Sequence, residues 1–408
     1  MKKTILFISS MDTKQEEIGL AVEIAHKNGC DTLILDTSTK TVIPGAGDIS
    51  PVEVLGYSKI TWDEFETMDK GARIETMAKA VVSYAQELYR QKRFDGVMSI
   101  GGGQNSQMSA AAMKELPYGV PKLIVSTLAS GKRIFDTYVG NKDILVMHSV
   151  IDIAGVNSIT KMIINNAVSV MVGMVEYGIT LPAVKEKKRV AATMLGITTK
   201  GAVAVMDEME KMGCETIGFH ANGVGGGSME KLMDEDYFDL ILDMNLHEIT
   251  CEFLGGFCTG AYQRLLKGAK KGIPQIIVPG AIDVLDFGVT LETRESVMEA
   301  VKDRQYYFHN AGIIHSKIKK EEAEKLGQVV AGRLNQATGP IELIIPLKGF
   351  CEAGARGKAL YNKEVDDTFI TVLKENLNSS VHVIEVEANI NDQAFADVVI
   401  EEAKKMIA

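Results

Sequence analysis

Ile100-Gly101-Gly102-Gly103-Gln104-Asn105-Ser106 joins an apolar run at 94–100 to an amphipathic pattern at 106–116. The three glycines carry no Cβ where a strand gives way to a helix, so a ligand can approach the bare backbone and the first N–H groups of the helix. Such N–H groups attract anions, most often phosphates. The alternative is a tight strand-to-helix turn that needs glycine for its dihedral angles alone.

The same alternation of strand and helix extends along the whole chain. The strand-like apolar runs are 4–9, 32–36, 96–100, 122–126, 143–148, 189–194, 216–220, 240–243, 275–279, 341–346 and 382–385. The helical patterns are 15–27, 74–90, 106–116, 160–176, 202–212, 229–234, 258–270, 320–338 and 392–408. Runs that are apolar throughout suit strands buried on both faces of a parallel sheet. The sequence therefore predicts an α/β fold of two Rossmann-like, doubly wound domains with mainly parallel sheets.

The length of 408 residues favours two domains, because a single hydrophobic core rarely extends over so long a chain. A stretch rich in proline and charge, Leu181-Pro182-Ala183-Val184-Lys185-Glu186-Lys187-Lys188-Arg189, is typical of a linker. We predict an N-terminal domain at 1–182, a linker at 183–188 and a C-terminal domain at 189–408.

Composition excludes several classes of partner. The formal net charge is −10, from 44 Lys+Arg against 54 Asp+Glu, and no basic stripe appears that would bind nucleic acid. The apolar run at 4–8 is too short for a signal peptide, and no run of uniformly apolar residues has the length of a membrane span. The five cysteines are scattered without a CxxC pair, which favours a reducing cytoplasm and argues against structural zinc. We expect a cytoplasmic protein without a nucleic-acid or membrane partner.

The loops after the first-half strands are small, polar and rich in hydroxyls, and parallel strands bring such loops to one edge of the sheet. Lys14 can place a positive charge on a phosphate, while Thr13, Thr39 and Ser106 can donate hydrogen bonds. Asp12 suits a helix cap, or a ligand of ribose or metal. The chain lacks GxxxxGK[ST] and the third glycine of GxGxxG, which disfavours a P-loop ATPase and a nicotinamide dehydrogenase.

Longer strings of residues resemble a known family. The strings at 101–106, 116–122, 126–131, 138–140 and 149–157 are similar to the Tm-one-like ATP-binding family, that of the N-terminal region of the tomato mosaic virus resistance protein. This family is otherwise catalogued as an uncharacterised protein family. The similarity continues at 12–14, 36–39, 222–226, 278–283 and 308–311, and so covers essentially the whole chain.

The resemblance implies two Rossmann-like domains with ATP bound in the first. The ATP contacts that it implies are Asp12, Thr13, Lys14, Thr39, Lys70, Gly101, Gly102, Gly103 and Gln104. This chain departs from the family at Gln104 and Asn105, where relatives often carry more glycine. Lys70 stands where an arginine can stand, which keeps the charge but loses the planar fork of donors.

The second half offers another set of polar loops at its strand ends. A glycine-rich loop at 223–227 enters a helix and is a second candidate anion cradle. His220, His247, Asp283 and His309 form a candidate acid/base group, with the alternative that each one only caps or orients a loop. We predict no metal site, because no HxxxH or HExxH spacing is present.

These features together predict an ATP-binding, two-domain protein that acts as an enzyme on a small metabolite in the interdomain cleft. The competing hypothesis is a non-catalytic, ATP-regulated module that acts through a protein partner. Whether ATP is hydrolysed and whether Mg²⁺ accompanies it stay open, because the residues compel no phosphoryl-transfer mechanism. A homodimer is expected from the resemblance and from how common symmetric dimers are.

Overall fold

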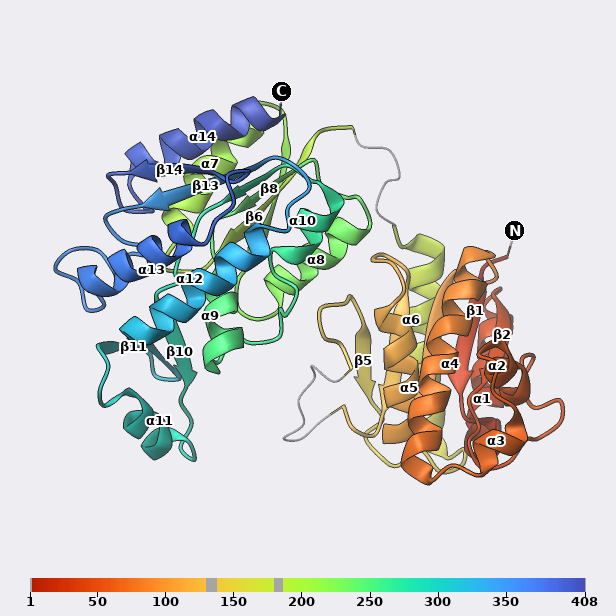
Figure 1. Cartoon of the computed structure of the whole chain (residues 1–408). Helices are drawn as coiled ribbons and strands as arrows, with labels where there is room; N and C mark the ends of the chain where they lie inside the picture. The colour runs from red at the N-terminus through yellow and green to blue at the C-terminus, as the bar shows by residue number, and fades with distance from the viewer. Residues whose placement is uncertain (1, 130–137, 180–185, 408) are drawn as a thin grey trace. The chain divides into compact units, whose positions relative to one another are not determined.

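The structure, a computed structural model, describes residues 2–129, 138–179 and 186–407 (Figure 1). Contacts divide the chain into two compact units, Met1–Ala183 and Val184–Ala408. Part of the predicted linker at 183–188 lies outside the described residues, and the predicted domain limits stay predictions. Each unit is an α/β fold around its own parallel sheet, as predicted.

The N-terminal unit is built on a five-stranded parallel sheet with the order β2-β1-β3-β4-β5. The strands are β1 (Thr4–Ser9), β2 (Asp31–Asp36), β3 (Gly96–Gly101), β4 (Lys122–Ser126) and β5 (Leu145–His148). The helices are α1 (Met11–Lys27), α2 (Pro51–Tyr57), α3 (Trp62–Glu66), α4 (Lys70–Arg90), α5 (Gly103–Lys114) and α6 (Ser158–Tyr177). This strand order reverses direction between β1 and β3, which is where open α/β sheets bind ligands.

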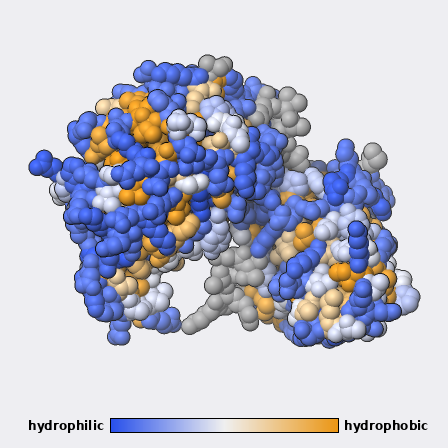
Figure 2. All heavy atoms as spheres, in the orientation of Figure 1, coloured by the Kyte–Doolittle hydropathy of each residue, from blue (hydrophilic) through white to orange (hydrophobic). Residues whose placement is uncertain are grey.

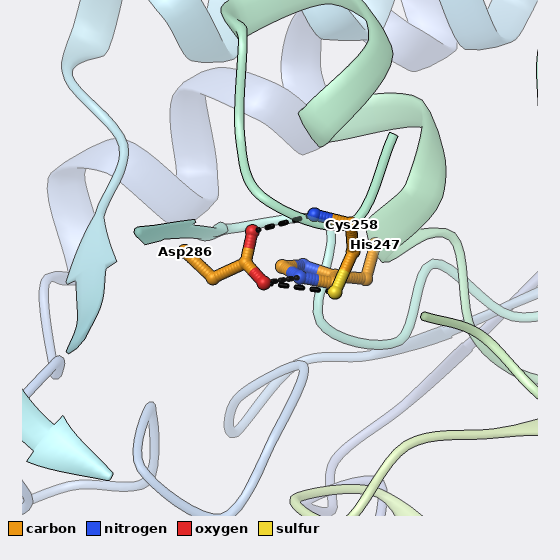
Figure 3. Close-up of side chains that lie close together, drawn as sticks. All are labelled: His247, Cys258 and Asp286. Atoms are coloured by element: carbon orange, nitrogen blue, oxygen red, sulfur yellow. Dashed lines mark hydrogen bonds and ion pairs between the residues drawn. The ribbon is translucent and has the colours of Figure 1, made fainter. Parts of the chain in front are cut away.

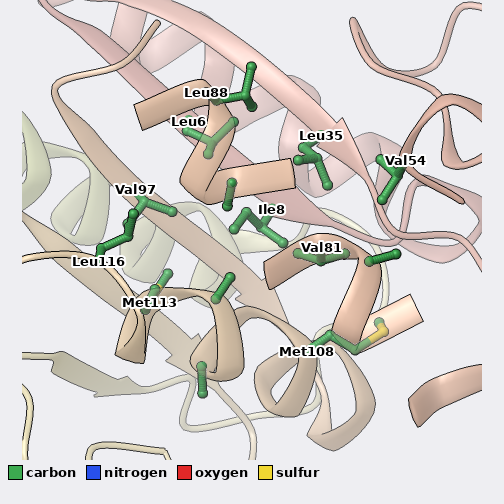
Figure 4. Packing of buried hydrophobic residues seen from close by; sticks show 14 of the residues in the cluster. Leu6, Ile8, Leu35, Val54, Val81, Leu88, Val97, Met108, Met113 and Leu116 are labelled. Atoms are coloured by element: carbon green, nitrogen blue, oxygen red, sulfur yellow. The ribbon is translucent and has the colours of Figure 1, made fainter. Parts of the chain in front are cut away.

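Alternate residues of β1 belong to two separate hydrophobic cores. Leu6 and Ile8 pack with residues of α4 and α5, such as Val81 and Met108 (Figure 4). Ile5 and Phe7 face the opposite way and pack against α1 and α6. A strand buried on both faces must be apolar at every position, which explains its continuous apolar run.

Helix α6 is long and apolar enough to cross a membrane by length and composition alone. Its sequence is not a uniformly apolar run, because Lys161, Asn165 and Asn166 interrupt it. Buried residues of α6, among them Ile164, Val168 and Met171, pack in the core against the sheet and α1. One such helix is weak evidence for a membrane span, and its packing is that of a core helix.

The main sheet of the C-terminal unit has six parallel strands in the order β14-β13-β9-β8-β6-β7. They are β6 (Arg189–Met194), β7 (Glu215–His220), β8 (Leu240–Asp243), β9 (Gln275–Ile277), β13 (Ile341–Pro346) and β14 (His382–Val386). The helices are α7 (Thr199–Lys211), α8 (Gly225–Asp234), α9 (His247–Leu254), α10 (Leu266–Lys271), α11 (Arg294–Val301), α12 (Lys320–Leu334), α13 (Lys363–Glu375) and α14 (Gln393–Ile407). Helices α7 and α14 pack in one core, and α12 and α13 pack in another.

A small antiparallel sheet with the order β10-β12-β11 was not predicted from the sequence. Its strands are β10 (Val284–Gly288), β11 (Tyr306–Asn310) and β12 (Ile313–Lys317). These strands form no continuous apolar run, because β11 is largely exposed and β12 buries polar side chains. Figure 1 shows β10, β11 and α11 extending beyond α9.

The predicted helix at 258–270 is wrong, since only Leu266–Lys271 is helical there. The polypeptide instead forms α9 at His247–Leu254, which ends at Gly255 in the left-handed conformation. Over the visible face of both units, hydrophilic residues predominate with apolar residues between them (Figure 2).

Candidate functional site

A cavity of about 270 Å³ lies at the carboxyl ends of the N-terminal strands. It is lined by Ser10, Asp12, Thr13, Lys14, Thr39, Lys40, Gly102, Gly103, Gln104, Asn105 and Asp152. Seven of the predicted contacts thus meet in one place, whereas Gly101 and Lys70 are not part of the lining. Gly101 is buried in β3 and Lys70 is exposed at the start of α4.

The three glycines differ in what a side chain would meet. A Cβ at Gly101 would lie 2.8 Å from the Cβ of Asn105, and one at Gly103 would lie 2.6 Å from Cδ1 of Leu128. Packing therefore requires glycine at position 101, whereas at position 103 the end of the Leu128 side chain would have to shift. A Cβ at Gly102 would have Thr127 Oγ1 at 3.9 Å as its nearest neighbour, so Gly102 borders open space.

The first N–H groups of α5 are free to bind a ligand. Gly102 is its N-cap and supplies no side-chain hydrogen bond. Within the described residues, the backbone N–H groups of Gly103, Gln104 and Asn105 have no acceptor, and the first intrahelical bond is donated by Ser106 to Gly102. The start of this helix therefore presents unsatisfied donors to the cavity.

Helix α1, by contrast, has its first N–H groups already bonded. The Met11 N–H donates to the Asp36 carboxylate at 3.0 Å, and the Asp12 N–H donates to Ser38 Oγ at 2.9 Å. Asp36 also accepts from the Ser38 N–H, and burial raises its pKa. Asp36 thus holds the start of α1 and does not line the cavity.

Charged groups of both signs line the cavity. The Lys14 ammonium donates to the Ile153 carbonyl and lies 3.9 Å from a carboxylate oxygen of Glu17. The Asp12 carboxylate accepts from the Lys40 N–H at 3.3 Å. Asp12 does not cap α1, because Ser10 is the N-cap, so its carboxylate stays at the cavity.

Arg73 does not line the cavity but holds the backbone of Thr39, which does, and it was not predicted. Its Nη1 donates to the Thr39 carbonyl at 3.2 Å, and Gln104 Nε2 donates to Thr39 Oγ1 at 2.9 Å. Nε of Arg73 is buried and has no partner in the described structure. Residues 70 and 73 are three apart and lie on one face of a helix. The helical period at Lys70 was therefore the sequence signal from which Arg73 could have been predicted.

The four predicted acid/base residues of the second half do not form one group. His220 is exposed at the end of β7. Asp283 is buried in an ion pair with Lys317 at 2.6 Å, and Lys317 also pairs with Asp366 at 2.5 Å. Asp283 therefore neutralises a buried lysine, and this role is structural.

His247 and His309 are connected through His315, which was not predicted. The rings of His309 and His315 stack with centroids 4.6 Å apart, and the rings of His315 and His247 are 6.5 Å apart. Tyr307 Oη lies 3.0 Å from Nδ1 of His315. Burial lowers the pKa of His315 to about 4, with a further contribution from the two neighbouring imidazoles.

Tyr307 and His309 face a cavity of about 400 Å³ in the C-terminal unit. Its other lining residues are Gly196, Ile197, Glu352, Ala353, Lys358 and Ala359. The cavity thus combines an exposed imidazole, a carboxylate and an ammonium group. This set can bind a small polar molecule and exchange protons with it.

His247 is fully buried in a cluster with Cys251, Cys258 and Asp286, and Figure 3 shows His247, Cys258 and Asp286. Burial acts to lower the pKa of His247, but the hydrogen bond and charge of Asp286 outweigh it and raise that pKa. Burial acts to raise the pKa of Asp286, and His247 outweighs this and lowers it. Burial, followed by the charge of Asp286, raises the pKa of both thiols.

The second candidate anion cradle is filled by the protein itself. The N–H groups of Gly223 and Gly226 donate to Oε1 of Glu248 at 2.8 and 3.2 Å. The other oxygen of Glu248 accepts from the buried guanidinium of Arg264, which also pairs with Asp243. The prediction of an anion-binding loop was correct in its chemistry, but the anion is an internal carboxylate.

Comparison with known proteins gives matches over both units. The models of the N-terminal and C-terminal domains of an uncharacterised protein family (UPF0261) match residues 3–180 and 187–407. A UPF0261 protein of Clostridium tetani is 36% identical over 417 residues, covering 100% of this chain and 99% of the relative. Another, from Mesorhizobium japonicum, is 29% identical and covers 97% and 98%.

A plant protein is also similar to this chain. The ToMV resistance protein Tm-1(GCR237) of Solanum lycopersicum is 31% identical over 352 residues. The match covers 82% of this chain but 45% of the tomato protein.

Proposed function

The chain belongs to the uncharacterised protein family UPF0261, and from that premise we propose that its N-terminal unit binds ATP at the carboxyl ends of β1, β2 and β3. The resemblance to the family of the tomato resistance protein is confirmed by the matches at the level of the family. ATP is the nucleotide that the resemblance implies.

The free N–H groups at the start of α5 are the observation that carries this proposal. Three consecutive donors border a cavity beside a glycine whose Cβ position is open. The positive end of the helix dipole adds to these donors and favours a phosphate group there. Helix α1 is excluded as the phosphate cradle because Asp36 and Ser38 already accept its first hydrogen bonds.

The side chains around the cavity suit the rest of a nucleotide. Lys14 and Lys40 can neutralise phosphate charge, and the guanidinium of Arg73 adds a positive charge behind the Thr39 backbone. Asp12 and Asp152 supply carboxylate oxygens, which are the ligands that Mg²⁺ takes beside substrate phosphates. A bound Mg²⁺ would offset the repulsion between these carboxylates and the phosphates.

For the C-terminal unit we propose catalysis on a small polar metabolite in the cavity of Tyr307 and His309. His309 is exposed to that cavity, whereas His247 and Asp283 are buried, so His309 is the acid/base candidate among the predicted residues. The stacked His315 keeps a low pKa beside it and can accept a proton only weakly at neutral pH. We further propose a cytoplasmic homodimer, which light scattering on the purified chain would test.

Calorimetric titration of the full chain with ATP, ADP and GTP, with and without Mg²⁺, tests the nucleotide proposal. Lys14→Ala should weaken ATP binding at least ~10-fold, because a charge-assisted contact to phosphate is lost. Gly173→Ala is the matched control, since Gly173 lies in α6 and its Cβ position is open. Absence of binding by the wild type, or equal affinity in Lys14→Ala, would refute the site.

Turnover is tested separately, by NMR of a metabolite mixture incubated with ATP and the protein. Loss of a metabolite that depends on His309 supports an enzyme. Nucleotide binding without any turnover favours the alternative, an ATP-regulated module that acts through a protein partner.

A further inference from the structure

The cluster of His247, Cys251, Cys258 and Asp286 is used neither by the nucleotide cavity nor by the metabolite cavity. We propose that these four side chains bind a thiophilic divalent cation, with Zn²⁺ as its probe. This proposal is independent of ATP binding and does not rest on it.

One ligand atom each from His247, Cys258 and Asp286 lies within 4.8 Å of the others, and Cys251 lies beside this group. Nε2 of His247 lies 3.4 Å from Cys251 Sγ and 3.4 Å from Asp286 Oδ2. Cys258 Sγ lies 2.9 Å from the same oxygen, Asp286 Oδ2, whereas Cys251 Sγ lies 3.0 Å from the other oxygen, Oδ1. Zinc bonds of about 2.0 to 2.3 Å place tetrahedral ligands about 3.3 to 3.8 Å apart, so Cys251 completes a tetrahedral set if its side chain turns toward the other three ligands.

The local backbone holds these side chains in place. His247 and Cys251 are four residues apart on α9 and therefore share one face of the helix. The N–H groups of Phe257 and Cys258 donate to Asp286 Oδ1 at 2.9 and 3.3 Å, which orients the carboxylate. A Cβ at Gly256 would lie 2.6 Å from Cys251 Sγ and 2.9 Å from Asp286 Oδ1, so a glycine there leaves room for the cluster.

Two thiols, one imidazole and one carboxylate are better suited to binding a thiophilic ion than to hydrogen bonding with one another. A neutral thiol is a weak donor, yet the thiols of Cys251 and Cys258 both point at one buried carboxylate, and Figure 3 shows this for Cys258. The ion would replace both thiol protons, which leave to solvent, and its double charge would neutralise two of the three negative charges on the two thiolates and the carboxylate. Imidazole and thiolate together favour Zn²⁺ among the divalent cations.

Such an ion would fasten the small antiparallel sheet to the rest of the C-terminal unit. Asp286 lies on β10, while His247 and Cys251 lie on α9 and Cys258 follows in the next loop. Strand β10 pairs with β12, which carries His315 beneath His309. Metal binding would therefore stabilise the sheet that supports the metabolite cavity.

Metal analysis of the full chain, purified under reducing conditions, tests the proposal. We expect about one thiophilic ion per chain after incubation with Zn²⁺ and desalting. Stripped protein should take up Co²⁺ and show a thiolate-to-cobalt charge-transfer band together with intense visible bands of tetrahedral Co²⁺. Chelation should lower the melting temperature, and added Zn²⁺ should restore it.

Cys258→Ser and Asp286→Asn should lose at least ~10-fold in Zn²⁺ affinity. Cys214→Ser is the matched control, because Cys214 is also buried in the C-terminal unit but lies in a different core. Wild-type protein that gives no thiolate-to-cobalt band overturns the proposal even if a variant fails to fold. Equal affinity in Cys258→Ser and Cys214→Ser would also overturn it.

Discussion

Gly102→Val should weaken ATP binding while leaving the fold intact. The backbone at Gly102 has φ −84° and ψ −169°, an extended conformation that valine adopts readily. Its Cβ position has no atom nearer than Thr127 Oγ1 at 3.9 Å, so valine meets no clash in the described structure. An apolar residue in place of glycine at an N-cap costs about 1 kcal/mol or less.

The effect on binding should be larger than the effect on stability. The valine methyl groups would occupy the space through which a phosphate reaches the N–H groups of Gly103, Gln104 and Asn105. Loss of one charge-assisted hydrogen bond costs about 1.5 to 3 kcal/mol, which is about a 10- to 150-fold rise in Kd. Gly102→Ala should give a smaller rise, because it adds a single methyl group.

Calorimetry with ATP gives the Kd, and thermal unfolding of the same samples reports the fold. Gly101→Ala separates the two effects, because its Cβ would lie 2.8 Å from the Cβ of Asn105 and should lower stability as well. If Gly102→Val binds ATP as tightly as the wild type, the triple glycine is only a turn and the phosphate site is elsewhere.

Arg73→Lys should raise the Kd for ATP about 3- to 10-fold, because lysine lacks the planar fork of donors; unchanged calorimetry would limit Arg73 to holding its loop. Burial raises the pKa of Glu230 from its ordinary 4.5 to about 8, so the folded chain keeps a proton that the unfolded chain releases. Wild-type stability should therefore fall by about 5 kcal/mol relative to Glu230→Gln as pH rises across that range, and denaturant titrations that run parallel at all pH values would contradict this. Gly226→Ala should destabilise the C-terminal unit by more than ~2 kcal/mol, because its Cβ would lie 1.9 Å from a buried carboxylate oxygen, whereas Gly196→Ala meets nothing within 4 Å and should melt like the wild type. His309→Ala should abolish metabolite turnover by NMR without changing the Kd for ATP, and turnover that survives would remove His309 from catalysis.

Most of the fold was predictable because strands buried on both faces have a local signature. The apolar runs at 4–9, 122–126, 189–194, 240–243 and 341–346 match the limits of β1, β4, β6, β8 and β13. The antiparallel sheet of β10, β11 and β12 has no such signature, since its strands are stabilised by pairing with one another. Lys317 shows why β12 was not predicted. A lysine is buried there only because two carboxylates from other segments neutralise its charge.

The candidate sites were predictable to different degrees. Residues of the nucleotide cavity follow directly after strands, so their meeting was predicted from parallel topology. The cluster of His247, Cys251, Cys258 and Asp286 was not predicted, because it contains no CxxC, HxxxH or HExxH spacing. The spacing of His247 and Cys251, one helical turn apart, was the signal available, but Asp286 lies on a strand that the sequence did not predict.

The sequence by itself determined the α/β class, the parallel sheets, the family and the triple glycine at the end of β3. These properties depend on local periodicity and on short strings of residues, which can be read without knowing any distant contact. The tertiary structure alone decided which glycine-rich loop has free N–H groups. Glu248 fills the loop at 223–227 from a different segment, whereas the described residues leave Gly103, Gln104 and Asn105 without acceptors. A loop can bind an outside anion only if no internal one reaches it, and that depends on contacts between residues far apart in the chain.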